Sequence, residues 1–177
     1  MSCYRFDKDI YINVTKSWLP EREKLNKYID KIYMSNILTN NGPLVEELTK
    51  RLKQYLGVEN ILLVTNGTLA LQIAFRVLCI SKLAITTPFS FIATASSLLW
   101  ENIKPQFVDI SERTLCLCSK KISEVINNET TAIVPVHVFG NACPVNDINN
   151  LAEDNGLKVI YDASHAFGIK YEGKSIL

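Results

Sequence analysis

Short apolar runs alternate with amphipathic segments along most of this chain. From residue 61 to residue 161, runs of mostly apolar residues are separated by segments whose apolar residues recur at helical spacing. Because a strand that is apolar throughout is buried on both faces, the alternation predicts an α/β fold with a mostly parallel sheet covered by helices. The runs expected to be strands are 61–64, 83–86, 106–109, 132–136 and 158–161.

The segments between these runs are expected to be helices. They cover residues 69–78, 90–100, 122–127 and 145–153, and Gly156 follows the last of them as a helix-ending residue. The tail of the chain contains Tyr-Glu-Gly-Lys over residues 171–174, a composition typical of a tight turn.

The first part of the chain has a different character. An arm precedes residues 21–33, whose apolar residues recur at helical spacing, and an Asn-Asn-Gly-Pro loop follows over 38–43. A stripe of leucines then predicts a helix over 44–56. We therefore expect an N-terminal arm, helix and Asn-rich loop over residues 1–43, and an α/β domain over residues 44–177.

Composition excludes several classes of protein. The 177 residues carry a formal net charge of +1, with 47% hydrophobic and 21% charged residues and no basic block, so we expect no nucleic-acid partner. No run reaches the roughly 20 apolar residues that a membrane span requires, and the start lacks an apolar leader, so we expect a cytoplasmic protein. The five cysteines and two histidines lack metal-site spacing, which predicts reduced thiols and no metal.

Asp162 follows the last apolar run and is the residue on which the functional interpretation depends. Ligands of open α/β sheets bind at the carboxyl ends of the strands, where this carboxylate is expected. It could pair with a ligand atom that is kept positive, or it could cap the next turn through a side-chain oxygen. Taken alone, the structural interpretation is favoured, because capping aspartates are common at strand ends.

Asn66-Gly67-Thr68 follows the first apolar run and opens a helix. A glycine lets the backbone approach a ligand, and a helix N-terminus offers free N–H groups, the usual basis for phosphate binding. A simple N-cap explains the same residues equally well. The Walker and Rossmann glycine patterns are both missing.

Two further strand ends carry ring side chains. Pro88 ends the second run and directs Phe89 and Phe91 to the same edge of the sheet, where a ring could cover a planar ligand or pack in the core. His137 ends the fourth run, and a single histidine there is more often a hydrogen-bonded structural residue than a catalyst.

A phosphate cradle, an aromatic ring and an acid together fit pyridoxal 5'-phosphate (PLP). The phosphate would bind the amides of Gly67 and Thr68, the ring would lie against Phe91, and the pyridine nitrogen would face Asp162. An ionised carboxylate raises the pKa of a pyridine nitrogen and keeps the ring cationic, the state that withdraws electrons from a carbanion.

Six blocks of this sequence, in this order, resemble the N-terminal portion of the DegT/StrS-type nucleotide-sugar aminotransferases. The blocks are 38–45, 65–71, 87–94, 107–110, 133–137 and 161–168. The resemblance implies the large domain of the aspartate-aminotransferase type (fold type I), C-terminally incomplete, with PLP at a homodimer interface. It also implies transfer of an amino group from glutamate to a keto-deoxysugar nucleotide, in surface-polysaccharide or antibiotic sugar biosynthesis.

The resemblance assigns roles by position. Gly67 and Thr68 would hold the cofactor phosphate, Phe91 would cover the ring, and Asp162 would pair with the pyridine nitrogen. His165 would lie beside the ring. The loop residues Asn40 and Asn41 would lie near the substrate entrance.

Two departures from the family pattern matter. Many members have Glu where this chain has Tyr161, and members place the Schiff-base lysine some twenty or more residues after the Asp. The only lysines after Asp162 are Lys170 and Lys174, which are expected to be solvated. We therefore expect no catalytic lysine in this chain and no activity of the chain alone.

Two alternatives stay open at this point. One is a non-catalytic regulatory module that binds PLP or a nucleotide-sugar. The other is part of a PLP-dependent sugar dehydratase, which uses the same scaffold without the lysine. In the family's sheet the first strand, here 61–64, is reached through two strands that come later than residue 177, so we also expect a gap in the sheet.

Overall fold

The computed structural model describes residues 16–177 of the chain. They belong to two compact units, one ending at Leu48 and the other covering Thr49–Leu177. Most of the expected N-terminal arm lies outside the described residues.

The first unit is built on helix α1 (Arg22–Ser35) and the start of helix α2 (Pro43–Leu56). Helix α1 ends at Asn36, whose left-handed conformation (φ 54°) lets its N–H donate to the carbonyl of Ile32. Pro43 opens α2, where its missing N–H costs no intrahelical bond. Both helices expected in this part of the chain are confirmed.

The second unit contains a parallel four-stranded sheet. Its strands are β1 (Leu83–Thr86), β2 (Lys104–Phe107), β3 (Thr130–Ile133) and β4 (Lys158–Val159), in the order β2-β1-β3-β4. An isolated parallel bridge between Val136 and Asp162 continues the β3–β4 pairing toward the carboxyl edge. The expected parallel sheet is therefore confirmed.

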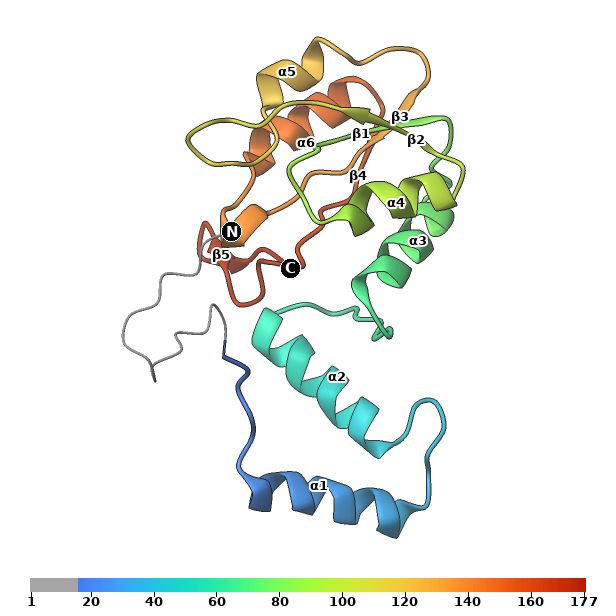
Figure 1. Cartoon of the computed structure of the whole chain (residues 1–177), viewed down its shortest axis with the longest axis vertical. Coiled ribbons are helices and arrows are strands. Elements are labelled where there is room, and N and C mark those ends of the chain that lie inside the picture. Colours follow the sequence, from blue (N-terminus) through green and yellow to red (C-terminus); the bar gives the residue numbers. More distant parts are fainter. Residues whose placement is uncertain (1–15) are drawn as a thin grey trace, which may run out of the picture. The chain divides into compact units, whose positions relative to one another are not determined.

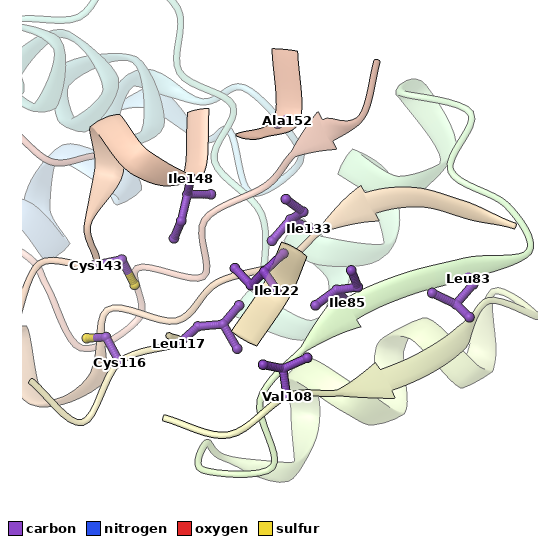
Figure 2. Close-up of a cluster of buried hydrophobic side chains, with 10 residues drawn as sticks. All are labelled: Leu83, Ile85, Val108, Cys116, Leu117, Ile122, Ile133, Cys143, Ile148 and Ala152. Carbon is purple, nitrogen blue, oxygen red and sulfur yellow. The ribbon is translucent and has the colours of Figure 1, made fainter. Parts of the chain in front are cut away.

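Helices cover both faces of this sheet. Helices α3 (Gly67–Val77) and α4 (Ile92–Trp100) lie on one side, and α5 (Ser119–Ser123) and α6 (Val145–Asp154) lie on the other (Figure 1). Side chains alternate between the two cores as a strand requires, because Ile85 packs with α5 and α6 while Ala84 packs with α3 and α4. Figure 2 shows the core on the α5–α6 side, where the thiols of Cys116 and Cys143 are buried.

A small hairpin follows the sheet. Strands β5 (Lys170–Tyr171) and β6 (Lys174–Ser175) are antiparallel, and the two residues between them both have positive φ (50° for Glu172 and 80° for Gly173). This is the conformation of a two-residue hairpin turn, so the predicted turn is confirmed.

Several sequence-based assignments differ from the structure, including the bounds of β3, which was expected over 132–136, and of β4, which was expected over 158–161. The run 61–64 forms no strand, because a strand requires a hydrogen-bonded neighbour and no described segment pairs with it; Leu62 is 71% exposed. Strand β2 begins two residues earlier than expected, since the N–H of Lys104 already bonds to Lys82. The helix expected over 122–127 is α5, which ends sooner because Asn127 turns the chain into β3.

Candidate functional site

A cavity of about 260 Å³ lies at the carboxyl edge of the sheet in the second unit. Its walls come from the start of α3, from the loop before α4 and the start of α4, from Val136 after β3, and from residues 162–165 after β4. The structure brings five of the predicted site residues together here: Gly67, Thr68, Phe91, Asp162 and His165.

Asp162 lines this cavity and is almost fully buried. Its side chain is 8% exposed and accepts three hydrogen bonds: Oδ2 from Thr94 Oγ1 (2.7 Å), and Oδ1 from Ser164 N (3.1 Å) and Ser164 Oγ (2.7 Å). The bond from Ser164 N caps the turn, which is the contact that the structural interpretation expects. Since a carboxylate offers about four acceptor sites, one remains for a donor in the cavity.

The backbone around Asp162 is equally constrained. Its N–H donates to the carbonyl of Pro135 (2.9 Å), and its carbonyl accepts from the N–H of His137 (3.0 Å). These bonds continue the β3–β4 ladder past the assigned strands. The carboxylate is therefore positioned by a ladder on one side and by α4 on the other.

The start of α3 presents backbone donors to the same cavity. Asn66 is the N-cap, and its Oδ1 accepts from Leu69 N (2.8 Å). In the described part of the chain, the amides of Gly67 and Thr68 have no hydrogen-bond partner, as is usual in a first helical turn. A Cβ on Gly67 would lie 3.4 Å from Ser164 Oγ, so glycine keeps the space between α3 and the Asp162 turn open.

The two aromatic residues before α4 differ in position. Phe91 lines the cavity and is 70% exposed, so the core-packing interpretation is wrong for this ring. Phe89 is 40% exposed and meets Phe139 edge-on, with ring centroids 6.1 Å apart.

His165 follows Asp162 in the sequence and also lines the cavity. Its Nδ1 accepts from the N–H of Phe139 (3.4 Å), and the two rings are parallel with centroids 6.0 Å apart. Phe139 belongs to the 3-10 turn η1 (Val138–Gly140) and has φ 53°, a rare conformation for a bulky residue. The turn thus holds the His165 ring from one side.

His137 does not line this cavity. It is fully buried, its Nδ1 accepts from Cys143 N (3.0 Å), and its ring is parallel to that of Tyr161, with centroids 4.9 Å apart. Burial lowers the pKa of His137, against the opposing effect of the Asp162 charge. The ring is thus hydrogen-bonded through Nδ1 in the interior, as the structural interpretation of His137 expects.

Asn40 and Asn41 belong to the first unit, in the turn that joins α1 to α2. Asn41 has φ 57°, in agreement with the expectation that this loop uses left-handed conformations. Their role near a substrate stays a prediction.

Sequence reasoning missed part of the cavity. Ser164 and Thr94 bind the carboxylate directly, and Ser90 adds a hydrogen bond to Thr94 (Oγ–Oγ1 2.8 Å). The spacing of Ser90 and Thr94 by four residues was the available signal, because such residues lie on one side of a helical turn. The remaining lining residues that were not predicted are Asn66, Ala93 and Val136.

Metal ligands, membrane-spanning helices and a lysine at the cavity were all expected to be missing, and each can be checked within residues 16–177. Residues 16–177 contain no group of three potential metal ligands, and within the same residues no helix is long and apolar enough to cross a bilayer. Lys170 and Lys174 are exposed on the hairpin, and among residues 16–177 no lysine lines the Asp162 cavity.

Comparison with known proteins was made for sequence and for fold. The chain is 43% identical over 168 residues to dTDP-4-amino-4,6-dideoxy-D-glucose transaminase from Escherichia coli, which covers 95% of this chain and 45% of the relative. Among solved structures, DesI in the presence of its TDP-sugar product superposes with a TM-score of 0.84 at 30% identity, covering 88% of this chain and 40% of DesI. NtdA from Bacillus subtilis with bound cofactor PMP superposes with a TM-score of 0.79 at 28% identity, covering 96% of this chain and 41% of NtdA.

The chain therefore spans less than half the length of these relatives. Their fold is the PLP-dependent aminotransferase fold of type I, as the resemblance implied. The model of the DegT/DnrJ/EryC1/StrS aminotransferase family matches residues 20–176, nearly all of the chain. This chain belongs to the DegT/DnrJ/EryC1/StrS aminotransferase family.

Proposed function

We propose that this chain supplies the PLP site of an aminotransferase that moves an amino group from glutamate to the keto carbon of a nucleotide-linked deoxysugar. The observation that carries the proposal is that Gly67, Thr68, Phe91, Asp162 and His165 line one cavity. Further support comes from relatives named for sugar transamination and from PMP bound in NtdA.

The residues present fit the cofactor. The amides of Gly67 and Thr68, which have no partner in the described residues, would hold the phosphate at the N-terminus of α3. Phe91, exposed in the cavity, would cover one face of the ring. The remaining acceptor site of Asp162 would bind the protonated ring nitrogen.

The chemistry divides between cofactor and protein. When bound, PLP supplies an electron sink for a substrate carbanion. Asp162 would keep a proton on the ring nitrogen, because an ionised carboxylate next to that atom favours its cationic form. Thr94 and Ser164 would orient the carboxylate, and His165, fixed by the Phe139 amide, would lie beside the ring.

Binding of PLP to the purified chain tests the proposal. Asp162→Asn keeps the side-chain shape but removes the charge, and we expect the Kd for PLP to rise by about tenfold or more, the change that loss of a charge-assisted hydrogen bond produces. Asp109→Asn is the matched control, because Asp109 is an exposed carboxylate near another strand end, paired with Lys121 at 2.8 Å. Equal Kd values for wild type and Asp162→Asn would contradict the proposed site.

A second candidate function, a module that binds PLP or a nucleotide-sugar without transferring an amino group, rests on the same cavity, which could hold either ligand. Under both proposals the chain alone should bind PLP without a covalent bond. Borohydride treatment of the complex, followed by intact-mass measurement, is expected to leave the chain mass unchanged. Addition of the cofactor mass at Lys170 or Lys174 would show that these exposed lysines react with the cofactor.

We also propose that the protein acts as a homodimer. Helix α4 leaves Ile92, Leu99 and Trp100 exposed at 69%, 61% and 79%, and apolar side chains gathered on one helix favour burial against another surface. Sedimentation should give a dimer for wild type and a monomer for Trp100→Glu. A wild-type monomer at all concentrations tested would contradict this part of the proposal.

A further inference from the structure

A second cavity, also of about 260 Å³, lies in the same unit and shares no lining residue with the first. The two cavities are separated by the strand ends. Val136 and Asp162 line the first, whereas their chain neighbours His137 and Tyr161 line the second. Successive residues of an extended chain point to opposite sides, so the same backbone forms one wall of each cavity.

The second cavity lies at the N-terminus of α6. Val145 and Asn146, the first two residues of this ten-residue helix, line it. No side chain caps the helix, and the first backbone bond of the helix is from Ile148 N to Pro144 O (3.0 Å). The amides of the first turn therefore have no intrahelical partner and carry the positive end of the helix dipole.

His137 provides an independent indication that a ligand binds here. Its Nδ1 accepts a hydrogen bond from Cys143 N, so the proton of the neutral ring is on Nε2. This Nε2 is the one buried side-chain nitrogen or oxygen without a partner in the part of the chain that the structure describes. A buried donor without an acceptor destabilises a protein, so an acceptor from outside the chain is expected.

The two charged side chains of the wall differ in whether they already have a partner. Lys174, on β6, is exposed and makes no ion pair among the described residues. Glu172 is the one carboxylate of the wall, and its Oε1 already accepts from Asn146 Nδ2 (3.3 Å). Tyr161, which also lines the cavity, directs its hydroxyl to Asn149 Oδ1 (3.0 Å).

From this arrangement we propose that the second cavity binds a small phosphate-type oxyanion, with the α6 amides, His137 Nε2 and Lys174 as donors. The site is distinct from the proposed cofactor cavity and does not depend on it. The oxyanion could be free phosphate or a phosphoryl group of a larger molecule. In the second case the rest of the molecule would have to lie outside the cavity.

The two histidines of the chain report on the two cavities separately, since His137 lines the second and His165 the first. Imidazole ¹H–¹⁵N correlation spectra, assigned with His165→Gln, would follow a titration with inorganic phosphate at constant pH and ionic strength. We expect a saturable shift of the His137 resonances. A response of His165 alone would place phosphate in the first cavity and overturn this inference while supporting the proposed cofactor site.

Two lysines of the hairpin give a matched pair of variants. Lys174→Gln should raise the phosphate Kd about fivefold, which corresponds to about 1 kcal/mol, whereas Lys170→Gln should leave it unchanged, because Lys170 does not line the cavity. Glu172→Gln should lower the Kd, since it removes the one carboxylate of the wall. Equal effects of the two lysine variants would show non-specific attraction and overturn the proposal.

A parallel titration with a nucleoside diphosphate distinguishes the source of the oxyanion. Tighter binding than that of phosphate, still sensitive to Lys174→Gln, would identify a phosphoryl group of a nucleotide as the ligand. Weaker binding would identify free phosphate. No saturable His137 shift with either probe would mean that the cavity holds only water, and the proposal would be wrong.

Discussion

Thr94 Oγ1 donates a hydrogen bond of 2.7 Å to Asp162 Oδ2, which joins the first turn of α4 to the end of the β4 region. Because the Thr94 hydroxyl has one proton and the carboxylate can only accept, the 2.8 Å contact between Ser90 Oγ and Thr94 Oγ1 must have Ser90 as donor. The three side chains form a directed relay. It orients the carboxylate on which the proposed cofactor site depends.

Removing the middle of this relay should destabilise the fold. Thr94 is 1% exposed and Asp162 8% exposed, so Thr94→Val would leave a buried carboxylate oxygen without its donor while nearly keeping the side-chain volume. We expect the free energy of unfolding to fall by about 1–3 kcal/mol. Urea denaturation followed by tryptophan fluorescence measures it.

Thr94→Ser is the matched control, because it keeps the hydroxyl that donates to Asp162. Ser90→Ala should cost less than Thr94→Val, since it removes a donor to a hydroxyl and not to a carboxylate. If Thr94→Val and Thr94→Ser had the same stability, the hydrogen bond to Asp162 would contribute nothing.

Four of the five cavity residues could be predicted because their positions follow from chain order, whereas His165 was expected here only through the family resemblance. Gly67 and Thr68 follow one apolar run, Phe91 another, and Asp162 the last, and in a parallel sheet these segments reach the same edge. The rule holds even for Gly67, although the run that precedes it is not a strand in the structure. To expect a residue at this edge, it was enough to know that it follows the carboxyl end of an apolar run.

The partners of Asp162 could not be predicted in the same way. Thr94 is separated from Asp162 by 68 residues, and their hydrogen bond depends on how α4 lies against the sheet. The second cavity also depends on how distant segments pack together, since it combines His137, the start of α6 and the β5–β6 hairpin. Local sequence pattern contains no distance between such segments, so it could not identify either arrangement.

Acidification should destabilise the protein through His137. Burial lowers the pKa of His137 below its ordinary value of about 6.5, so the unfolded chain binds a proton more readily than the folded one. Stability from this residue is fully present above about pH 6.5 and is lost as the pH falls toward the folded pKa. The expected slope is at most about 1.4 kcal/mol per pH unit, measured by urea denaturation at several pH values.

The two histidines again provide the control. His137→Asn offers Oδ1 in place of Nδ1 as acceptor for Cys143 N and cannot titrate, so its stability should depend less on pH in this window. His165→Gln changes an exposed residue and should keep the wild-type slope. A wild-type slope in His137→Asn would assign the effect to carboxylates instead.

Tyr161 directly precedes Asp162, and the structure shows what its ring does. It stacks on His137 at 4.9 Å, and its hydroxyl donates to Asn149 Oδ1 of α6 at 3.0 Å. Tyr161→Phe keeps the stack and should cost about 1 kcal/mol of unfolding free energy for the lost hydrogen bond.

Tyr161→Ala should cost more, about 3–5 kcal/mol, since it also leaves a cavity beside His137. The difference between the two variants measures the ring packing. Equal destabilisation by Tyr161→Phe and Tyr161→Ala would show that the ring contributes little and that the hydroxyl accounts for the effect.

Gly168 closes the motif that contains Asp162, and a side chain there should be unfavourable for two reasons. It has φ 79°, and a Cβ would lie 3.1 Å from the hydroxyl oxygen of Tyr55, which also stacks on Phe167 at 5.6 Å. Gly173, with φ 80° and nothing within 4 Å of a Cβ, is a matched control that has the conformational cost alone. We expect Gly173→Ala to lower the free energy of unfolding by about 1–2 kcal/mol, and Gly168→Ala to lower it further.

Combining Gly168→Ala with Tyr55→Phe separates the two causes. The double variant lacks the hydroxyl that a Cβ would meet, so its cost relative to Tyr55→Phe should fall to that of Gly173→Ala relative to wild type. Thermal and urea unfolding of the four variants measure the difference. If the cost of Gly168→Ala stayed the same in the Tyr55→Phe background, the contact with Tyr55 would not restrict this position.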